Sequence, residues 1–281
     1  MIILDGKGLA ERKHLFLKEQ IDIYTKQGFR KPCLAIIQVG DDPASNSYIK
    51  GKRNACEQVG IDFIHINFSY EIIEQEISDT IQKLNQDDKV DGILVQLPIP
   101  KHLNEKKLTN EIDYLKDVDG FHLVNRGLLF EGQPGIRPAT PQGIMDLLDE
   151  YKIDVKGMNA VVVGRSVIVG LPVAKMLIDR HATVTTCHSK TIDIGSITKN
   201  ADILVVAIGK PKFITKDMVK ENAIIIDVGI NRVDGKLCGD VDFENVKEKT
   251  SHITPVPKGV GPMTISALLH NTFNNYLKKI L

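Results

Sequence analysis

Seven short apolar runs, separated by segments with helical periodicity, constrain the fold of this chain more than any other feature. They cover residues 33–39, 63–68, 92–97, 160–163, 183–187, 203–207 and 223–228. The runs are nearly continuous rather than alternating, which is typical of parallel strands buried on both faces of a sheet. Because helical patterns lie between most of them, the order predicts an α/β fold with parallel sheets.

A stretch rich in glycine and proline near the middle of the chain predicts two domains. The length of 281 residues suits one large or two medium domains. The stretch lies between residues 121 and 141 and includes Gly132, Pro134, Gly135, Pro138 and Pro141. We therefore expect a first domain over residues 1–120 and a second over residues 141–263. A final helix over residues 264–281 could pack back on the first domain and tie the two together.

Composition narrows the class of protein. Hydrophobic residues make up 42% of the chain and charged residues 26%, the mix of an ordinary soluble globular protein. Acidic and basic residues number 36 each, so nothing indicates a surface for nucleic acid or membranes. We recognise no signal peptide and no apolar run long enough to span a bilayer. The four cysteines are scattered without metal-type pairing, so we expect reduced thiols, a cytoplasmic location and no metal site.

Lys52 lies on the apolar side of an expected helix. Asp42 and Pro43 resemble a helix start, with an Asp cap and Pro at the first helical position. At about 100° per residue, Lys52 then projects into the apolar arc one turn after Tyr48. Burial lowers the pKa of a lysine, so Lys52 beside Tyr48 is a candidate acid/base group. The alternative, a buried stem with its ammonium in water, remains open.

The second domain contains a candidate nucleotide-binding corner. The apolar run 160–163 leads directly into Gly164-Arg165-Ser166, and a helical pattern begins after Gly170. A buried strand, a glycine turn and a helix N-terminus together bind phosphate in dinucleotide-binding folds. The spacing departs from G-x-G-x-x-G because Ser166 takes the second glycine position. A plain strand-to-helix turn is the alternative.

The residues after the next expected strand bear on the choice of cofactor. Folds that use NAD usually place an acid there for the ribose hydroxyls, whereas this chain has His188-Ser189-Lys190 and no acid before Asp193. Together with Arg165, these side chains would accept a phosphate on the ribose, which favours NADP over NAD. They could instead be solvated loop residues.

Three further segments carry candidate polar groups in the order of the chain. Gln96 lies near the carboxyl end of an expected buried strand, where its amide needs partners. Asp117 and Asp119 precede Gly120, a pattern that could simply be a turn. The segment 259–264 ends at an expected helix start, whose N–H groups could face a ligand.

Taken together, these motifs resemble the bifunctional methylenetetrahydrofolate dehydrogenase/methenyltetrahydrofolate cyclohydrolase family over essentially the whole chain. The matching segments are Asp41-Asp42-Pro43-Ala44-Ser45 with Tyr48 and Lys52, Val95-Gln96-Leu97-Pro98, Lys116-Asp117-Val118-Asp119-Gly120-Phe121, Gly164-Arg165-Ser166 through Gly170-Leu171-Pro172, and Pro255-Val256-Pro257-Lys258-Gly259-Val260-Gly261-Pro262-Met263-Thr264. The family pattern usually has Gly where this chain has Lys258.

The resemblance implies a reaction and an architecture. The reaction is NADP-dependent oxidation of 5,10-methylenetetrahydrofolate to the methenyl form, followed by hydrolysis to 10-formyltetrahydrofolate. The architecture is an N-terminal parallel-sheet α/β catalytic domain and a C-terminal Rossmann-type NADP-binding domain, with the active-site cleft between them. A homodimer is also implied.

The resemblance further implies roles for individual residues. Lys52 is the group essential to the cyclohydrolase step, Gln96 tunes that lysine, Tyr48 assists, and Asp119 anchors the pterin-like ring. The expected folate-binding residues are Tyr48, Lys52, Val95, Gln96, Leu97, Asp119, Gly259, Val260 and Gly261. The expected cofactor-binding residues are Gly164, Arg165, Ser166, Ser189 and Ile230.

Two other functions remain open at the level of sequence. Another two-domain NADP-dependent dehydrogenase, for example one acting on a small hydroxy acid, would explain the second domain. It would not explain a lysine on an inner helical face beside a glutamine strand. A non-catalytic NADP-sensing protein would bind the cofactor without turnover.

Overall fold

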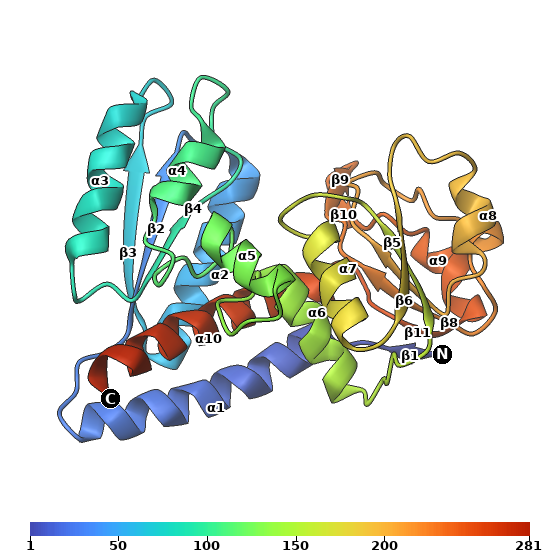
Figure 1. Cartoon of the computed structure of the whole chain (residues 1–281), viewed down its shortest axis with the longest axis horizontal. Coiled ribbons are helices and arrows are strands. Elements are labelled where there is room, and N and C mark those ends of the chain that lie inside the picture. The colour runs from blue at the N-terminus through green and yellow to red at the C-terminus, as the bar shows by residue number, and fades with distance from the viewer. The chain divides into compact units, whose positions relative to one another are not determined.

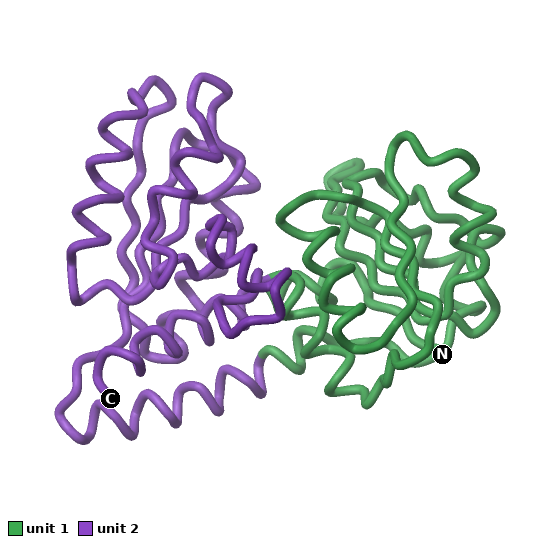
Figure 2. Tube along the Cα trace, in the orientation of Figure 1, with its two compact units in different colours: residues 1–10, 140–264 green, residues 11–139, 265–281 purple.

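The computed structural model describes residues 1–281, and the chain divides into two compact units (Figure 2). Unit 1 contains residues 1–10 and 140–264, and unit 2 contains residues 11–139 and 265–281. Each unit is an α/β assembly with its own parallel sheet, as the apolar runs predict. No helix combines the length and the apolar character needed to cross a membrane.

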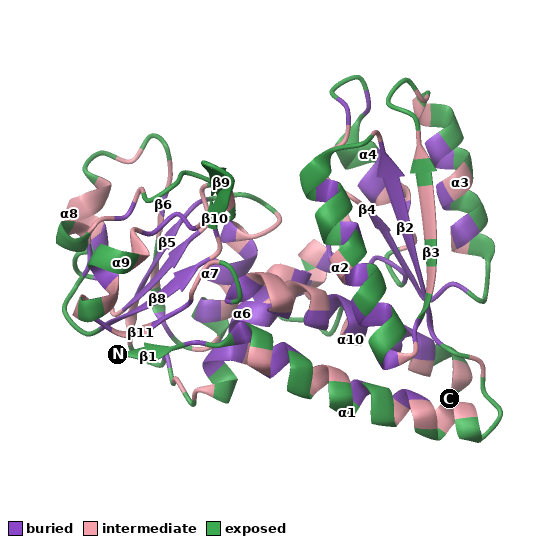
Figure 3. Ribbon diagram, turned by 180° about the vertical axis from the view of Figure 1, so that it is seen from behind, coloured by how far each residue is buried: buried purple, intermediate pink, exposed green.

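The sheet of unit 2 has three parallel strands in the order β3-β2-β4 (Figure 1). These are β2 (Cys33–Val39), β3 (Asp62–Phe68) and β4 (Gly92–Val95). Every residue of β2 and β4 is buried, whereas β3 at the edge is half exposed (Figure 3). β4 ends two residues before the predicted limit at residue 97, although the Gln96 N–H still bonds the Ile37 carbonyl of β2 at 2.8 Å.

Helices cover both faces of this sheet. One face packs against α1 (Gly6–Lys26), α2 (Pro43–Val59) and α10 (Val260–Ile280), and the other against α3 (Glu74–Gln86) and α4 (Glu105–Glu111). The division between the units falls within α1 and α10. The part of α10 in unit 2 contributes Leu268, Leu269, Phe273 and Tyr276 to the core that also contains β2 and α2.

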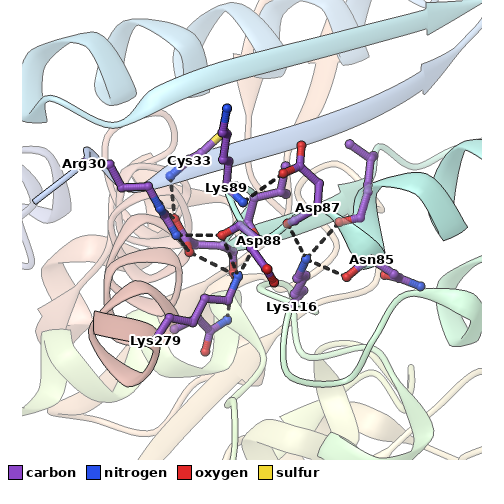
Figure 4. A network of polar contacts seen from close by, with 12 residues as sticks. Arg30, Cys33, Asn85, Asp87, Asp88, Lys89, Lys116 and Lys279 are labelled. Carbon is purple, nitrogen blue, oxygen red and sulfur yellow. Dashed lines mark hydrogen bonds and ion pairs between the residues drawn. The ribbon is translucent and has the colours of Figure 1, made fainter. Parts of the chain in front are cut away.

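A polar network attaches the end of α10 to the start of β4 (Figure 4). The buried Asp91 carboxylate accepts two bonds from the Arg30 guanidinium at 2.6 and 2.7 Å, and Lys279 of α10 lies 3.3 Å from it. The Arg30 guanidinium also stacks over the ring of Tyr276, 5.2 Å from its centroid. A buried carboxylate is tolerated because it is paired and hydrogen-bonded, and here the pairing fixes three elements together.

The neighbouring Lys116 has a structural role. Its buried ammonium donates to the carbonyls of Leu84, Asn85 and Asp87 at 2.7–2.9 Å (Figure 4). These carbonyls lie at the C-terminal end of α3, where the helix leaves acceptors unpaired and favours a positive charge. Lys116 therefore caps α3 and holds the start of the 116–120 segment in place.

The sheet of unit 1 has six parallel strands in the order β1-β11-β8-β7-β5-β6. They are β1 (Ile2–Ile3), β5 (Asn159–Val163), β6 (Thr183–Cys187), β7 (Ile203–Val206), β8 (Ala223–Asp227) and β11 (Thr250–Ile253). The chain passes from β5 to β6 on one side and then crosses to β7 on the other. In open α/β sheets, this reversal of direction marks the ligand-binding edge.

Helices also flank the second sheet. α6 (Ala139–Glu150) and α7 (Gly170–Asp179) pack on one face. α8 (Ile194–Thr198) and α9 (Phe243–Val246) pack on the other, with the short helix η1 (Lys216–Met218). A hairpin of β9 (Asn231–Val233) and β10 (Lys236–Cys238) follows β8, and η2 (Lys247–Lys249) precedes β11.

The structure differs from the predicted division of the chain in two places. Residues 1–10 belong to unit 1, because β1 pairs with β11 at the edge of its sheet. The Gly- and Pro-rich segment contains the helix α5 (Leu123–Phe130), and unit 2 continues to Ala139. The predicted limits of the functional domains, as distinct from these compact units, stay a prediction.

Candidate active site

Lys52 is buried, as its position on the helix suggested. α2 begins as predicted, with Pro43 in its first turn and the Asp42 carboxylate accepting the Ser45 N–H at 2.7 Å. Lys52 is only 7% exposed, whereas Lys50 and Arg53 on the same helix are exposed. The alternative of an ammonium reaching water is therefore wrong.

The partner of Lys52 comes from the end of β4 in the same unit. The Lys52 Nζ donates to Gln96 Oε1 at 3.0 Å, and Gln96 Nε2 donates to the Leu97 carbonyl at 2.7 Å. Both ends of the amide are thus engaged, which fixes its oxygen toward the lysine. Burial lowers the pKa of Lys52, while the nearby Asp119 carboxylate partly opposes this effect. A neutral acceptor that tolerates both protonation states of the lysine suits a group that exchanges protons.

Asp119 is held near Lys52 by a turn that Asp117 organises. The buried Asp117 carboxylate accepts the N–H groups of Phe121 and His122 at 3.2 and 2.8 Å. It also accepts the side-chain amide of buried Asn125 at 2.9 Å. The sequence analysis did not single out Asn125, whose amide bonds the Asp117 carboxylate. The turn interpretation of this segment, which the sequence analysis offered, is therefore correct for Asp117. Two acids before a glycine were the available signal.

Asp119 itself is not consumed by the turn. Burial raises the pKa of Asp119 to about 6, Lys52 opposes the rise and Asp117 adds to it. The turn closes at Gly120, which has a φ of 72° and leaves no room for a side chain, because a Cβ would lie 2.7 Å from the Pro138 nitrogen. Each of the two charged groups, Asp119 and Lys52, shifts the pKa of the other, so the two lie close enough to interact as an acid and a base in unit 2.

The remaining predicted residues of unit 2 differ in exposure. Tyr48 is 37% exposed, and partial burial raises its pKa. Val95 is buried in the core with α3, and Leu97 is partly exposed. Their assignment to a ligand site stays a prediction.

In unit 1, the glycine turn after β5 requires glycine at both ends. A Cβ on Gly164, whose φ is 128°, would lie 2.4 Å from the Ala207 carbonyl oxygen. A Cβ on Gly170 would lie 2.2 Å from the Gly164 carbonyl oxygen. Ser166 Oγ accepts the N–H groups of Val169 and Gly170, each at 3.2 Å, and so holds the backbone at the start of α7. The serine that breaks the usual glycine spacing therefore completes the turn by another means.

This turn lies where the sequence predicts binding of the phosphates of a dinucleotide, and that role stays a prediction. It is tightly packed, it lies at the carboxyl end of β5, and β6 and β7 flank that strand on opposite sides. Helix N-termini at such switch points bind anions. Arg165, Ser189 and Lys190 are exposed around it. Among the candidate ribose-site residues, His188 is committed to its own turn, where its Nδ1 accepts the Lys190 N–H at 3.2 Å.

Ile230 and the 258–261 segment also belong to unit 1. Ile230 is 43% exposed, and its Cδ1 lies 3.7 Å from where a Cβ on Gly261 would be. Gly259 is buried against the Pro255 carbonyl, and Val260 packs in the core. Lys258 has a φ of 86°, a conformation that costs a lysine about 1 kcal/mol relative to glycine. The roles predicted for this segment are not tested by its geometry.

Comparisons with known proteins agree across the chain. The model for the catalytic domain of tetrahydrofolate dehydrogenase/cyclohydrolase matches residues 4–119, and that for the NAD(P)-binding domain of the same family matches residues 138–280. The chain is 57% identical over 279 residues to the bifunctional protein FolD of Acholeplasma laidlawii, with 99% of each chain covered.

Solved structures show the same similarity. The crystal structure of the bifunctional enzyme FolD, methylenetetrahydrofolate dehydrogenase/cyclohydrolase, from Campylobacter jejuni has a TM-score of 0.97 and 48% identity, with 99% of each chain covered. The Trypanosoma brucei methylenetetrahydrofolate dehydrogenase-cyclohydrolase, complexed with NADP cofactor and inhibitor, has a TM-score of 0.96 and 32% identity. That comparison covers 100% of this chain and 98% of the other.

The raised pKa of Asp119 predicts a pH-dependent effect of its removal. The folded state holds this proton up to about pH 6, whereas the ordinary value is 3.8, so the Asp119 contribution to stability falls as pH rises from about 4 through 6. Asp119→Asn removes this titration. We expect its urea midpoint to exceed the wild-type midpoint by more at pH 8 than at pH 4.5. The control is Asp88→Asn, which changes an exposed acid of the same unit. If the urea midpoint of Asp119→Asn exceeded that of the wild type equally at both pH values, the assignment would be contradicted.

Proposed function

Since the chain belongs to the tetrahydrofolate dehydrogenase/cyclohydrolase family, we propose that it is a bifunctional enzyme of folate one-carbon metabolism. It oxidises 5,10-methylenetetrahydrofolate with NADP and hydrolyses the resulting 5,10-methenyl compound to 10-formyltetrahydrofolate. The observation that carries this proposal is the hydrogen bond of the buried Lys52 to the partly buried Gln96, in a chain that also has a tight glycine turn after β5. A dehydrogenase for hydroxy acids or a nucleotide sensor leaves that pair unexplained.

The dehydrogenase step depends on how the chain holds its two ligands. When bound, NADP⁺ supplies the hydride acceptor for the one-carbon bridge of the folate. We assign its phosphates to the Gly164–Gly170 turn and the phosphate on its ribose to Arg165 and Ser189. Ile230 is assigned to contact the cofactor. Positioning of donor and acceptor supplies much of the rate enhancement in such a reaction.

The cyclohydrolase step depends on Lys52 as a proton carrier. Water adds to the methenyl carbon, and the neutral Lys52 amine accepts a proton as the new C–O bond forms. The ammonium then returns a proton to the ring nitrogen as its bond to that carbon breaks, and the remaining hydroxyl proton leaves to water as the formyl C=O forms. Gln96 holds the Lys52 Nζ throughout, and the Asp119 carboxylate accepts N–H groups of the pterin-like ring. A cationic substrate favours the neutral form of a buried lysine, in line with its lowered pKa.

A coupled spectrophotometric assay tests the proposal and separates it from its rivals. With methylenetetrahydrofolate and NADP⁺, we expect NADPH formation followed by loss of the methenyl absorbance. A hydroxy-acid dehydrogenase would reduce NADP⁺ only with its own substrate, and a sensor would bind NADP⁺ without turnover. Either result would contradict the proposed activity.

We also propose a homodimer and a cytoplasmic location. β3 pairs with β2 on one side only, whereas the outer side of β4 is bridged by Asp117. An open strand edge is a natural site for pairing with another chain. Sedimentation equilibrium should give about twice the chain mass of 31.2 kDa, and a mass of one chain would contradict the dimer.

All four cysteines are unpaired thiols, which fits a reducing compartment.

Lys52→Met should abolish the cyclohydrolase step while the fold survives. The thioether fills the buried space without a charge, and loss of an acid/base group typically lowers a rate by about 10²–10⁴-fold. Lys52→Arg should also lack cyclohydrolase activity, because arginine stays protonated and cannot accept a proton. Hydrolysis of methenyltetrahydrofolate is the measurement, and Lys50→Met on the exposed side of α2 is the control. A near wild-type rate for Lys52→Met would remove Lys52 from the mechanism.

Arg165→Ala should narrow the preference for NADP over NAD more than it lowers the use of NAD. A guanidinium contacts the extra phosphate of NADP and nothing that is particular to NAD. The measurement is kcat/KM for both cofactors, with Lys156→Ala as the control because Lys156 precedes β5 at the opposite edge of the sheet. Equal kcat/KM for both cofactors in the wild type would reject the assignment.

A further inference from the structure

A fully buried carboxylate lies beneath the loop at the carboxyl end of β7. Asp240 is 0% exposed and follows the β9–β10 hairpin. Its Oδ2 accepts the N–H groups of Ile208 and Gly209 at 2.7 and 2.9 Å. Its Oδ1 accepts the Lys210 N–H at 2.8 Å and the Asn231 side-chain amide at 2.9 Å. One side chain therefore binds three consecutive backbone N–H groups and an amide from the segment after β8.

Three successive N–H groups that converge in this way form an anion-binding concavity. At this edge of a parallel sheet, such a concavity would ordinarily be available to a phosphate of the ligand. Here Asp240 occupies it from within the protein. The N–H of Gly209 is consequently not available to bind a phosphate. Asp240 instead anchors the 208–210 loop, which contains this glycine.

A second buried acid holds the anchor in place. The Asp227 carboxylate at the end of β8 accepts the N–H groups of Gly229, Asp240 and Val241 at 2.9–3.0 Å. The residue is only 4% exposed. Asp227 thereby fixes the backbone at Asp240 and at Gly229, in two segments separated by the hairpin.

The two acids leave no space at the glycines beside them. A Cβ on Gly229 would lie 2.2 Å from the Asp240 Cγ, and a Cβ on Gly239 would lie 1.8 Å from the Asp227 Oδ2. Ile230 lies between Gly229, which packs on Asp240, and Asn231, which bonds it. Both neighbours of the exposed Ile230 are thus held by the same carboxylate.

We propose that Asp240 is a positioning residue for cofactor binding: it joins the 208–210 loop to Asn231 and so fixes Ile230 for contact with the nicotinamide cofactor. The inference rests on the proposed function, since the contact of Ile230 with NADP belongs to it. Asp240 does not itself touch the ligand. Its effect is transmitted through Gly229 and Asn231.

The test compares Asp240→Asn with Asp234→Asn, which makes the same chemical change at an exposed turn of the same hairpin. In Asp240→Asn, an amide NH₂ replaces one acceptor and faces N–H donors. We expect the Kd for NADPH, measured by its fluorescence, to rise about tenfold or more, the effect of unpairing a buried polar group. Hydrolysis of methenyltetrahydrofolate needs no NADP, so its rate should stay at the wild-type value. Asp234→Asn should change neither quantity.

A milder variant covers the case in which Asp240→Asn does not fold. Asn231→Ala removes one of the four bonds to Asp240 at a partly exposed position, and we expect it to weaken NADPH binding severalfold while hydrolysis persists. If Asn231 acts through Asp240, the double variant should bind NADPH no more weakly than Asp240→Asn alone. Wild-type affinity in Asn231→Ala, or a parallel loss of hydrolysis in Asp240→Asn, would overturn the inference. Absence of NADPH binding by the wild type would instead contradict the proposed function.

Discussion

The hydrogen bond between the buried Lys52 amine and the Gln96 amide oxygen is the interaction on which the proposed chemistry depends. Removing a lysine ammonium from water costs free energy unless a polar partner is held within hydrogen-bond distance of it. That requirement explains the local architecture of unit 2: α2 presents Lys52 inward, and β4 ends where Gln96 can reach it. The 117–120 turn then brings Asp119 near the same ammonium. The lysine can therefore change its protonation state without losing its position.

Buried carboxylates hold irregular backbone at strand ends in both units. Asp117 binds the N–H groups of the turn that presents Asp119, and Asp240 binds the loop after β7. In each case, the N–H groups belong to segments that make no strand ladder and would otherwise be unpaired. Ligands of parallel sheets bind at these ends, so the loops there must be both irregular and rigid. An internal carboxylate meets both demands, because it accepts several N–H groups at once.

Much of the fold followed from the sequence because buried strands carry a strong signal. The apolar runs correspond to β2 through β8, and the Asp42–Pro43 start of α2 is confirmed. β1 and β11 were missed, since one has two residues and the other contains polar Ser251 and His252. Local patterns cannot show that such segments pair across a distance of some 250 residues. The placement of the last helix in the core of unit 2 was an expectation that only its packing contacts establish.

For the site, the sequence by itself determined the residue types and their order, and hence the inward face of Lys52 and the glycine turn after β5. Tertiary structure decided which polar groups are available for chemistry. Asp117 and Asp119 look alike in sequence, yet the Asp117 carboxylate accepts N–H groups of its own turn, whereas the Asp119 carboxyl lies near Lys52. Burial raises the pKa of both acids. Gly164 and Gly209 both follow strands, yet the Gly164 N–H bonds the Cys187 carbonyl of β6, whereas the Gly209 N–H bonds the Asp240 carboxylate. The physical reason is that hydrogen-bond partners distant in the chain meet only when the strands are assembled, and burial then sets the cost of leaving any of them unpaired.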